Sequence, residues 1–238
     1  MRASPPLSVV KLGGSLLENA TMRGQALEAI AAAFTSGERL VMVHGGGKEI
    51  DRNLSVLGIP KRMQGGLRIT DPATLDVVVK VLSGTINKSL VGQLQERGVV
   101  AAGLSGADGG TLFAEFHPPV DGVDLGFVGR VVSCSPALVE AILGAGLLPA
   151  VASIALGRDG VLLNVNADSA ASALAGALKA QRLVFMTDVE GVKDASGHVL
   201  DLLTAAEIRY LLGSSVITGG MRPSCRLASR LSRRALTR

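Results

Sequence analysis

The stretch "RLVMVHGGGKEI" (residues 39–50) joins an apolar run to three glycines and then to the beginning of a helical pattern. A nearly continuous apolar run of this kind is typical of a strand that is covered on both faces of its sheet. The stretch "VVKLGGS" (residues 9–15) repeats the arrangement closer to the N-terminus. Both stretches predict a buried strand that ends in a glycine loop and leads into a helix.

The same alternation continues along the chain. Strands are expected at 7–12, 39–47, 99–106, 124–135, 147–156, 160–166 and 182–189, and helices at 21–34, 48–58, 74–98, 136–146, 167–180 and 203–213. The segment "AEFHPPVDGVD" (114–124) is expected to be a loop or hairpin. This order favours an α/β fold, a three-layer αβα sandwich around a mostly parallel open sheet. In such sheets ligands bind at the carboxyl ends of the strands, where the glycines fall.

Composition excludes several classes of protein. Aromatic residues make up only 3% of the 238 residues and tryptophan is absent, so stacking platforms for nucleic acid are not expected. The sequence shows no signal-peptide pattern and no run approaching the ~18 apolar residues of a membrane span. The two cysteines, Cys134 and Cys225, have neither metal-ligand nor disulfide-framework spacing. We expect a cytoplasmic protein with free thiols and no metal cage, which binds neither nucleic acid nor membrane.

The two glycine loops predict an anion-binding site. Adjacent glycines allow backbone N–H groups to point toward one ligand, and each loop leads into a helix whose N-terminus favours negative charge. Lys11 precedes Gly13 and Gly14 in the first loop, and a lysine ammonium can neutralise phosphate oxygens. The sequence contains neither a P-loop pattern nor a dinucleotide-binding glycine pattern.

Two further stretches place polar side chains at expected loop positions. In "GGLRITD" (65–71) Arg68 is either a surface arginine or a fork for a carboxylate, and Asp71 is placed as the N-cap of the next helix. In "NVNADSAA" (164–171) Asn164 and Asp168 lie at a strand-to-helix turn. Asp168 is either a plain charge at a helix N-terminus or a group that positions lysines or a metal.

Seven stretches together resemble the acetylglutamate kinases, a group within the amino acid kinase family. They are "VVKLGGS", "VHGGGKEIDRNLSVLGIP", "GGLRITDPATLDVVVKVLSGTINKSLV", "GLSGADGG", "LNVNADSAASALA", "MTDVEGV" and "ITGGM". The resemblance covers residues 8–223. It implies transfer of the γ-phosphoryl group of ATP to the side-chain carboxylate of N-acetyl-L-glutamate, with Mg²⁺ carried by the nucleotide, in arginine biosynthesis.

The resemblance also implies roles for individual residues. Lys11 would stabilise the transferring phosphoryl group, Asp168 would orient catalytic lysines, and Arg68 would hold the α-carboxylate of the substrate. Substrate binding is implied for Gly46, Gly47, Arg68 and Asn164, and nucleotide binding for Gly13, Gly14, Thr187, Asp188, Gly219 and Gly220. The implied lobes are residues 1–178, for substrate and dimerisation, and residues 179–238, for the nucleotide. The implied assembly is a homodimer without arginine feedback.

The resemblance ends at "GGMRPSCR", where Ser224 stands at the position of the family's second catalytic lysine. The closing elements of the family fold are missing from this sequence, and residues 222–238 instead hold six arginines and no acidic residue. Residues 1–221, by contrast, hold 18 basic and 20 acidic residues. We expect this tail to be a frameshift product, because one base inserted after the codon of Pro223 in a GC-rich back-translation gives "PKLQACLA". Loss of the lysine predicts impaired turnover, by about 10²–10³-fold.

Three alternatives remain open at this stage. One is an aminoadipate-type kinase of lysine synthesis, although the "GGLRIT" loop favours the glutamate substrate. Another is a pseudoenzyme that keeps the acetylglutamate pocket and has lost turnover of ATP. The third takes the arginines of the tail as an anchor for nucleic acid or membrane, although a block of like charge is usually only solvated.

Overall fold

The structure is a computed structural model that describes residues 5–187 and the single positions 198 and 200. The chain divides into two compact units, Met1–Met186 and Thr187–Arg238, and all the elements below belong to the first. The helix expected at 203–213 lies outside the described residues. The predicted division into a substrate-binding and dimerisation lobe (residues 1–178) and a nucleotide-binding lobe (residues 179–238) concerns binding, and it stays a prediction.

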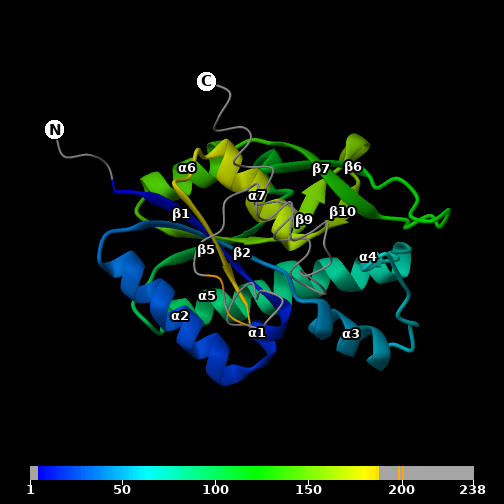
Figure 1. The fold of residues 1–238 in the computed structure, drawn as a ribbon, viewed down its shortest axis with the longest axis horizontal. Helices are drawn as coiled ribbons and strands as arrows, with labels where there is room; N and C mark the ends of the chain where they lie inside the picture. The colour runs from blue at the N-terminus through cyan, green and yellow to red at the C-terminus, as the bar shows by residue number, and fades with distance from the viewer. Residues whose placement is uncertain (1–4, 188–197, 199, 201–238) are drawn as a thin grey trace. The chain divides into compact units, whose positions relative to one another are not determined.

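A five-stranded parallel sheet forms the centre of the first unit (Figure 1). Its strands are β1 (Leu7–Leu12), β2 (Arg39–His44), β5 (Ala101–Ser105), β8 (Leu148–Ala152) and β11 (Arg182–Met186). The strand order is β11-β1-β2-β8-β5, so the two strands that carry the glycine loops are neighbours. The predicted parallel sheet is confirmed.

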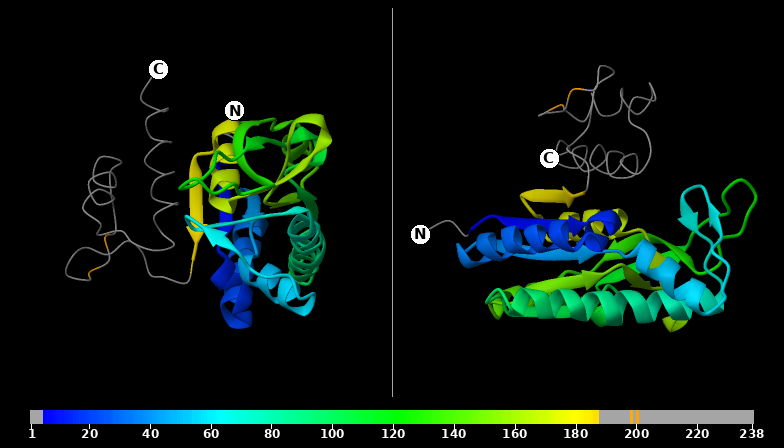
Figure 2. Two further views of the ribbon diagram at one scale, coloured as in Figure 1. Left: turned by 90° about the vertical axis from the view of Figure 1, so that its right-hand side faces the viewer. Right: turned by 90° about the horizontal axis from the view of Figure 1, so that it is seen from below.

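Helices cover both faces of this sheet, which gives the three predicted layers (Figures 1 and 2). On one face lie α2 (Ala20–Thr35) and α5 (Asn87–Gln95), and on the other lie α6 (Ala137–Gly144) and α7 (Ala167–Ala177). Successive side chains of a strand point to opposite faces. Val9 and Val41 accordingly pack with α7, whereas Val10 and Met42 pack with α2 and α5. The apolar runs are therefore continuous because both faces are buried.

A second group of four strands closes into a small ring beside the main sheet. It contains β6 (Leu112–Phe116), β7 (Val128–Cys134), β9 (Ile154–Leu156) and β10 (Leu162–Val165). The single strand expected at 147–156 is wrong, because the chain leaves the main sheet after Ala152 and enters the ring at Ile154. The hairpin alternative expected at 114–124 is confirmed, since residues 114–116 end β6, which pairs antiparallel with β7, and the remainder lies in the loop that connects the two strands.

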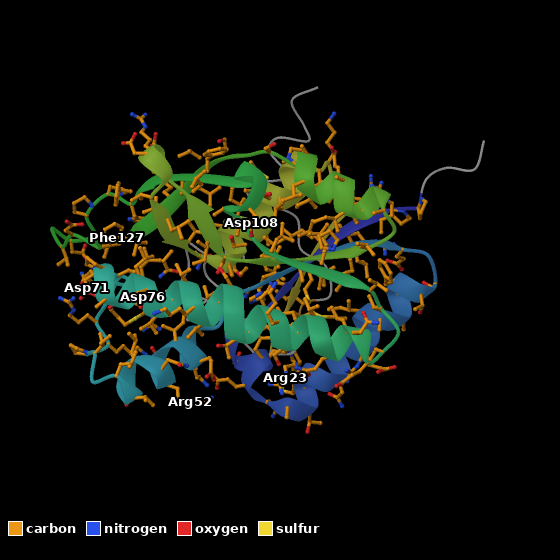
Figure 3. The ribbon with its side chains drawn as sticks, turned by 180° about the vertical axis from the view of Figure 1, so that it is seen from behind. Arg23, Arg52, Asp71, Asp76, Asp108 and Phe127 are labelled. Carbon is orange, nitrogen blue, oxygen red and sulfur yellow. The ribbon has the colours of Figure 1, made fainter. Side chains whose placement is uncertain are left out.

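The helix expected at 74–98 is one long helix with an unexpected segment in its middle. It begins as α4 (Pro72–Val79), continues as the π-helical segment η1 (Lys80–Ile86) and ends as α5. Asp71 is its N-cap, as predicted, since its side chain accepts a hydrogen bond from Thr74 N at 2.8 Å. Figure 3 shows this helix crossing the molecule, with Asp71 and Asp76 near its beginning.

Shorter elements complete the described part. They are α1 (Gly14–Glu18), α3 (Gly47–Val56), the hairpin of β3 (Met63–Gln64) and β4 (Leu67–Arg68), and two 3₁₀ turns at Asp108–Gly110 and Arg158–Gly160. Helix α3 packs against α4 and η1 through Ile50 and Leu54. In the described residues, no helix is both long and apolar enough to cross a membrane.

Candidate active site

The two glycine loops meet at the carboxyl ends of β1 and β2. Leu12 and His44, the last residues of these strands, are partners in the sheet register. A Cβ atom on Gly14 would lie 3.7 Å from Gly47 N, and a Cβ atom on Gly45 would lie 3.3 Å from the Cβ atom of Ala167. The loops and the beginning of α7 therefore border one small region, as parallel strand ends predict.

Lys11 and Asp168 form an ion pair in this region. Lys11 Nζ lies 2.7 Å from Asp168 Oδ1, and the two side chains are only 15% and 7% exposed. Helix α7 begins at an N-cap, Asn166, whose side chain accepts hydrogen bonds from Asp168 N at 2.9 Å and Ser169 N at 3.1 Å. Because this cap fixes the first turn of the helix, the Asp168 carboxylate is held facing the end of β1.

Arg68 is a buried arginine rather than a surface one. Its Nη2 atom lies 2.6 Å from Asp51 Oδ1 and donates a hydrogen bond to Gly47 O at 2.9 Å. Its Nη1 atom is buried and has no hydrogen-bond partner among the described residues. Burial opposes ionisation of the Asp51 carboxyl, but hydrogen bonds from Lys61 and Arg68 outweigh it and lower the pKa of Asp51. One side of the guanidinium is thus fixed to α3 and the glycine loop, and the Nη1 donors on the other side are unpaired within the described part of the chain.

Asn164 lies on β10, and its side chain reaches Thr70, two residues after Arg68. Its Nδ2 atom donates to Thr70 Oγ1 at 3.2 Å, and Thr70 Oγ1 donates to Arg68 O at 2.8 Å. Thr70 is completely buried. The structure therefore brings Asn164 within two hydrogen bonds of the backbone of Arg68.

The residues expected at the nucleotide are described only in part. Gly13 donates its N–H to Met186 O at 2.9 Å, which ties the first glycine loop to the end of β11, and Thr187 follows directly. Asp188, Gly219, Gly220 and Ser224 lie outside the described residues. Their expected roles stay predictions.

A cavity of about 220 Å³ lies beside the loops, between α1, α3 and the long helix. Gly14 and Gly46 line it together with Ile86 and the polar side chains of Glu18 and Arg23. Lys11, Arg68 and Asp168 do not line it. The cavity is therefore a neighbour of the charged pairs and not their common pocket. Across the described part of the chain, no three His, Cys, Asp or Glu side chains converge as metal ligands would.

Sequence reasoning missed Asp51, Thr70 and Asn166. Asp51 lies on α3 in "GGGKEID", four residues after Gly47, so helical spacing places it one turn from the loop. Asn166 was recognisable as an N-cap residue directly before a helical pattern. Thr70 gave no signal, because a threonine between a loop and a helix has many ordinary uses.

The covered parallel sheet, with glycine loops and a largely buried lysine at its strand ends, fits the class of enzymes that transfer phosphoryl groups. A model of the amino acid kinase family matches residues 6–237, and the chain belongs to this family. It is similar to the acetylglutamate kinase of Solibacter usitatus, with 46% identity over 213 residues that cover 90% of this chain and 81% of that protein. The acetylglutamate kinase of Agrobacterium fabrum is 42% identical over 224 residues, which cover 90% of this chain and 76% of that protein.

Solved structures give the same fold. The structure of smu.665 from Streptococcus mutans has a TM-score of 0.84 and 31% identity, and the match covers 94% of this chain and 89% of that one. N-acetylglutamate synthase from Neisseria gonorrhoeae, complexed with coenzyme A and N-acetyl-glutamate, has a TM-score of 0.83 and 25% identity, covering 96% of this chain and 52% of that one. Carbamate kinase from Giardia lamblia, at 14% identity and a TM-score of 0.65, shares the fold alone.

Proposed function

We propose that this chain transfers the γ-phosphoryl group of ATP to the side-chain carboxylate of N-acetyl-L-glutamate, a step of arginine biosynthesis. The family membership and the similarity to acetylglutamate kinases over 90% of the chain support the reaction class. The observation that carries the substrate assignment is the buried guanidinium of Arg68, whose Nη1 donor has no partner among the described residues. A buried donor of this kind is costly unless a ligand accepts its hydrogen bond.

The α-carboxylate of the substrate is the natural acceptor for Arg68. Arginine presents its donors in a planar fork that matches the two oxygens of a carboxylate. Asp51 and Gly47 O hold the Nη2 side of the fork, so the guanidinium is oriented before any ligand arrives. Pre-orientation lowers the entropic penalty of binding. Asn164, which is linked to the Arg68 backbone through Thr70, would contact the same substrate.

Lys11 would act on the transferring group. A side-chain carboxylate oxygen attacks the γ-phosphorus, the bond from that phosphorus to the β,γ-bridging oxygen breaks, and ADP leaves with the electron pair. The attacking carboxylate is already ionised near pH 7, so no general base is needed. What the reaction needs is neutralisation of charge and positioning. The Lys11 ammonium, fixed by Asp168 at 2.7 Å, supplies a positive charge at the end of β1.

The nucleotide and its metal complete this proposal. Mg²⁺, when bound with ATP, would neutralise charge on the phosphate oxygens. Gly13, Gly14, Gly46 and Gly47 would offer backbone N–H groups to the phosphates and the substrate, with Thr187, Asp188, Gly219 and Gly220 at the nucleotide. We also propose that the chain is a cytoplasmic homodimer. Light scattering of the purified chain would test the oligomeric state.

A coupled assay for ADP release tests the proposed function. The 238-residue chain, given ATP, Mg²⁺ and N-acetyl-L-glutamate, is expected to release ADP slowly but in a substrate-dependent manner, because Ser224 stands at the position of a catalytic lysine, and aminoadipate derivatives should not replace the acetylated substrate. Absence of ADP release would overturn the proposed turnover, and absence of calorimetric binding of N-acetyl-L-glutamate would overturn the substrate assignment as well.

A pseudoenzyme is the second candidate, and Ser224 favours it. In that case N-acetyl-L-glutamate binds with heat release, but no ADP forms. The same two measurements therefore separate the two candidates.

A further inference from the structure

His44 ends β2 and lies directly before the second glycine loop. Its side chain is completely buried, with Nδ1 at 3.0 Å from Gly45 O and Nε2 at 3.0 Å from Asn87 Nδ2. In a neutral imidazole one ring nitrogen donates and the other accepts, and the partners decide which is which. Which ring nitrogen of His44 carries the proton therefore depends on the orientation of the Asn87 amide.

Lys88 fixes that orientation. Its ammonium donates to Asn87 Oδ1 at 3.1 Å and to Gly103 O at 2.9 Å, while Asn87 Nδ2 lies 2.9 Å from Ala150 O. The flipped amide would place its NH₂ against the ammonium and its oxygen against a carbonyl, and both contacts are repulsive. Asn87 Nδ2 therefore donates to His44 Nε2, so that the remaining proton of the ring is on Nδ1 and is donated to Gly45 O.

The direction of the next peptide group follows from this bond. The C=O and N–H of a trans peptide point in opposite directions, and the described residues contain no cis peptide bond. Because Gly45 O faces the imidazole, the N–H of Gly46 faces away from it. The tautomer of His44 thus controls the direction in which the loop presents one of its backbone donors.

Packing fixes the same loop independently. A Cβ atom on Gly46 would overlap the Cδ1 methyl group of Ile86, the last residue of the π-helical segment. A Cβ atom on Gly103 would overlap Asn87 Oδ1, so this glycine of β5 leaves room for the amide. The extra residue in a π turn changes the direction in which the side chains after it point, and such turns are frequent at functional sites. Ile86 therefore packs against Gly46 of the loop, and Asn87 supports the loop through its hydrogen bond to His44, the residue before Gly45.

We propose that Asn87 and Lys88, placed by the π-helical segment, are positioning residues that hold His44 in its Nδ1–H tautomer and thereby orient the glycine loop 45–47 for phosphoryl transfer. The catalytic consequence rests on the proposed function, whereas the tautomer does not. Gly47 O of the same loop accepts from Arg68, so a displaced loop disturbs the carboxylate fork as well.

The chain has three histidines, so ¹⁵N NMR can resolve the His44 ring in the full-length protein. In the parent chain at pH 7 we expect a neutral ring protonated on Nδ1, with Nε2 as a hydrogen-bonded acceptor. Lys88→Met keeps the aliphatic stem and removes the ammonium, so the Asn87 amide is released and the ring should populate its Nε2–H form. Lys88→Arg should retain the parent tautomer.

The kinetic arm uses the same variants. In Lys88→Met we expect kcat to fall by about tenfold or more, because misplacement of a reacting group by ~1 Å costs up to 10²-fold. Lys80→Met is the matched control, since Lys80 lies on the same long helix and pairs with exposed Asp76. It should keep the parent kcat and the parent spectrum.

The outcomes separate the two proposals. An Nε2–H ring in the parent chain, or a Lys88→Met variant with parent tautomer and parent kcat, would overturn the positioning role. A parent chain without turnover would count against the proposed function. The tautomer measurement would still decide whether Asn87 and Lys88 hold His44 in its Nδ1–H form.

Discussion

Lys11 Nζ lies 2.7 Å from Asp168 Oδ1, although one residue belongs to the first strand of the chain and the other to α7, more than 150 residues later. Both side chains are largely buried, and removing one partner of such a pair leaves an uncompensated charge. The pair is therefore a fixed element of the site. Asp168 fixes the position of the Lys11 ammonium at the end of β1.

This relationship predicts different outcomes for the two partners. Lys11→Met removes a charge that acts on the transferring group, and we expect kcat to fall by about 10²–10³-fold. Asp168→Asn leaves the ammonium in place but loosely held, so a smaller fall in kcat is expected. Steady-state ADP release checks both. Arg130→Met, which breaks the exposed pair with Glu115, is the control and should keep the parent kcat. Unchanged kcat in Lys11→Met would refute the role of Lys11.

Arg68→Lys should separate substrate binding from folding. Lysine keeps the charge but cannot form the planar fork, so we expect the binding of N-acetyl-L-glutamate to weaken by ~1.5–3 kcal/mol. Calorimetry measures the affinity, and thermal unfolding shows whether the variant is folded. Arg62→Lys is the matched control, because Arg62 is half-exposed and pairs with Asp71, the N-cap of α4. Equal affinities of the two variants would contradict the assignment of Arg68.

The sequence predicts the main sheet because its strands are buried on both faces, and nothing but an apolar run satisfies that environment. It does not predict the four-stranded ring, since "LLPAVASIAL" is apolar except for Ser153, and the change of sheet at that residue is decided by tertiary pairing. Ser153 N donates to His44 O at 3.2 Å, a contact between residues far apart in sequence. The π-helical segment was missed for a related reason. Helical periodicity over 74–98 does not record one extra residue in a turn.

Some residues of the candidate site can likewise be predicted from the sequence, and others cannot. Lys11 and Arg68 are visible in the sequence because each stands near a pair of glycines, and Asp168 because it lies at an expected strand-to-helix turn. Their partners are not visible: Asp51 resembles any acidic residue on an exposed helix, and its pairing with Arg68 depends on how the β3–β4 hairpin folds back. Asn87 resembles an ordinary helix residue, and only its burial against β5 and β8 shows its function as a donor.

His44 predicts how stability depends on pH. Burial lowers the pKa of His44 from 6.5 to about 4, with the hydrogen bond to Gly45 opposing the shift and the charge of Lys88 adding to it. Between these two pKa values the unfolded chain binds a proton that the folded chain does not. Stability is therefore fully present above pH 6.5 and falls as the pH drops toward 4, by roughly 3 kcal/mol from this group.

Urea unfolding at several pH values measures this dependence. His44→Asn retains a donor near Gly45 O and removes the titration, so its unfolding free energy should change less between pH 6.5 and pH 4 than that of the parent chain. His117→Asn, on the loop after β6, is the control and should follow the parent chain. If His44→Asn and the parent chain show the same pH dependence, the buried neutral state of His44 is wrong.

Cys134 should be an unreactive thiol. It lies at the end of β7, and burial raises its pKa to about 11, so the thiolate that reacts with alkylating agents is scarce near pH 7. In a Cys225→Ser background only Cys134 remains, because the chain has two cysteines. Iodoacetamide should label it readily in denaturant and slowly in the native protein, as mass spectrometry would show. Rapid labelling of the native protein would mean that the end of β7 is open to solvent.

Ser224 offers a test by gain of function. It stands in "GGMRPSCR", where the resemblance places a second catalytic lysine, and it lies outside the described residues. If the missing cation limits the rate, Ser224→Lys should raise kcat by up to about 10²–10³-fold, since a positive charge near the transferring group favours the transition state. Ser214→Lys adds the same charge elsewhere in the same unit and is the matched control.

A frame-restored gene, read as "PKLQACLA" after residue 222, goes further because it replaces the basic tail as well as the serine. An increase with the restored frame and none with Ser224→Lys would show that the altered tail, and not the single lysine, limits turnover. Robust turnover by the 238-residue chain itself, with the given reading frame intact on resequencing, would reject the frameshift interpretation.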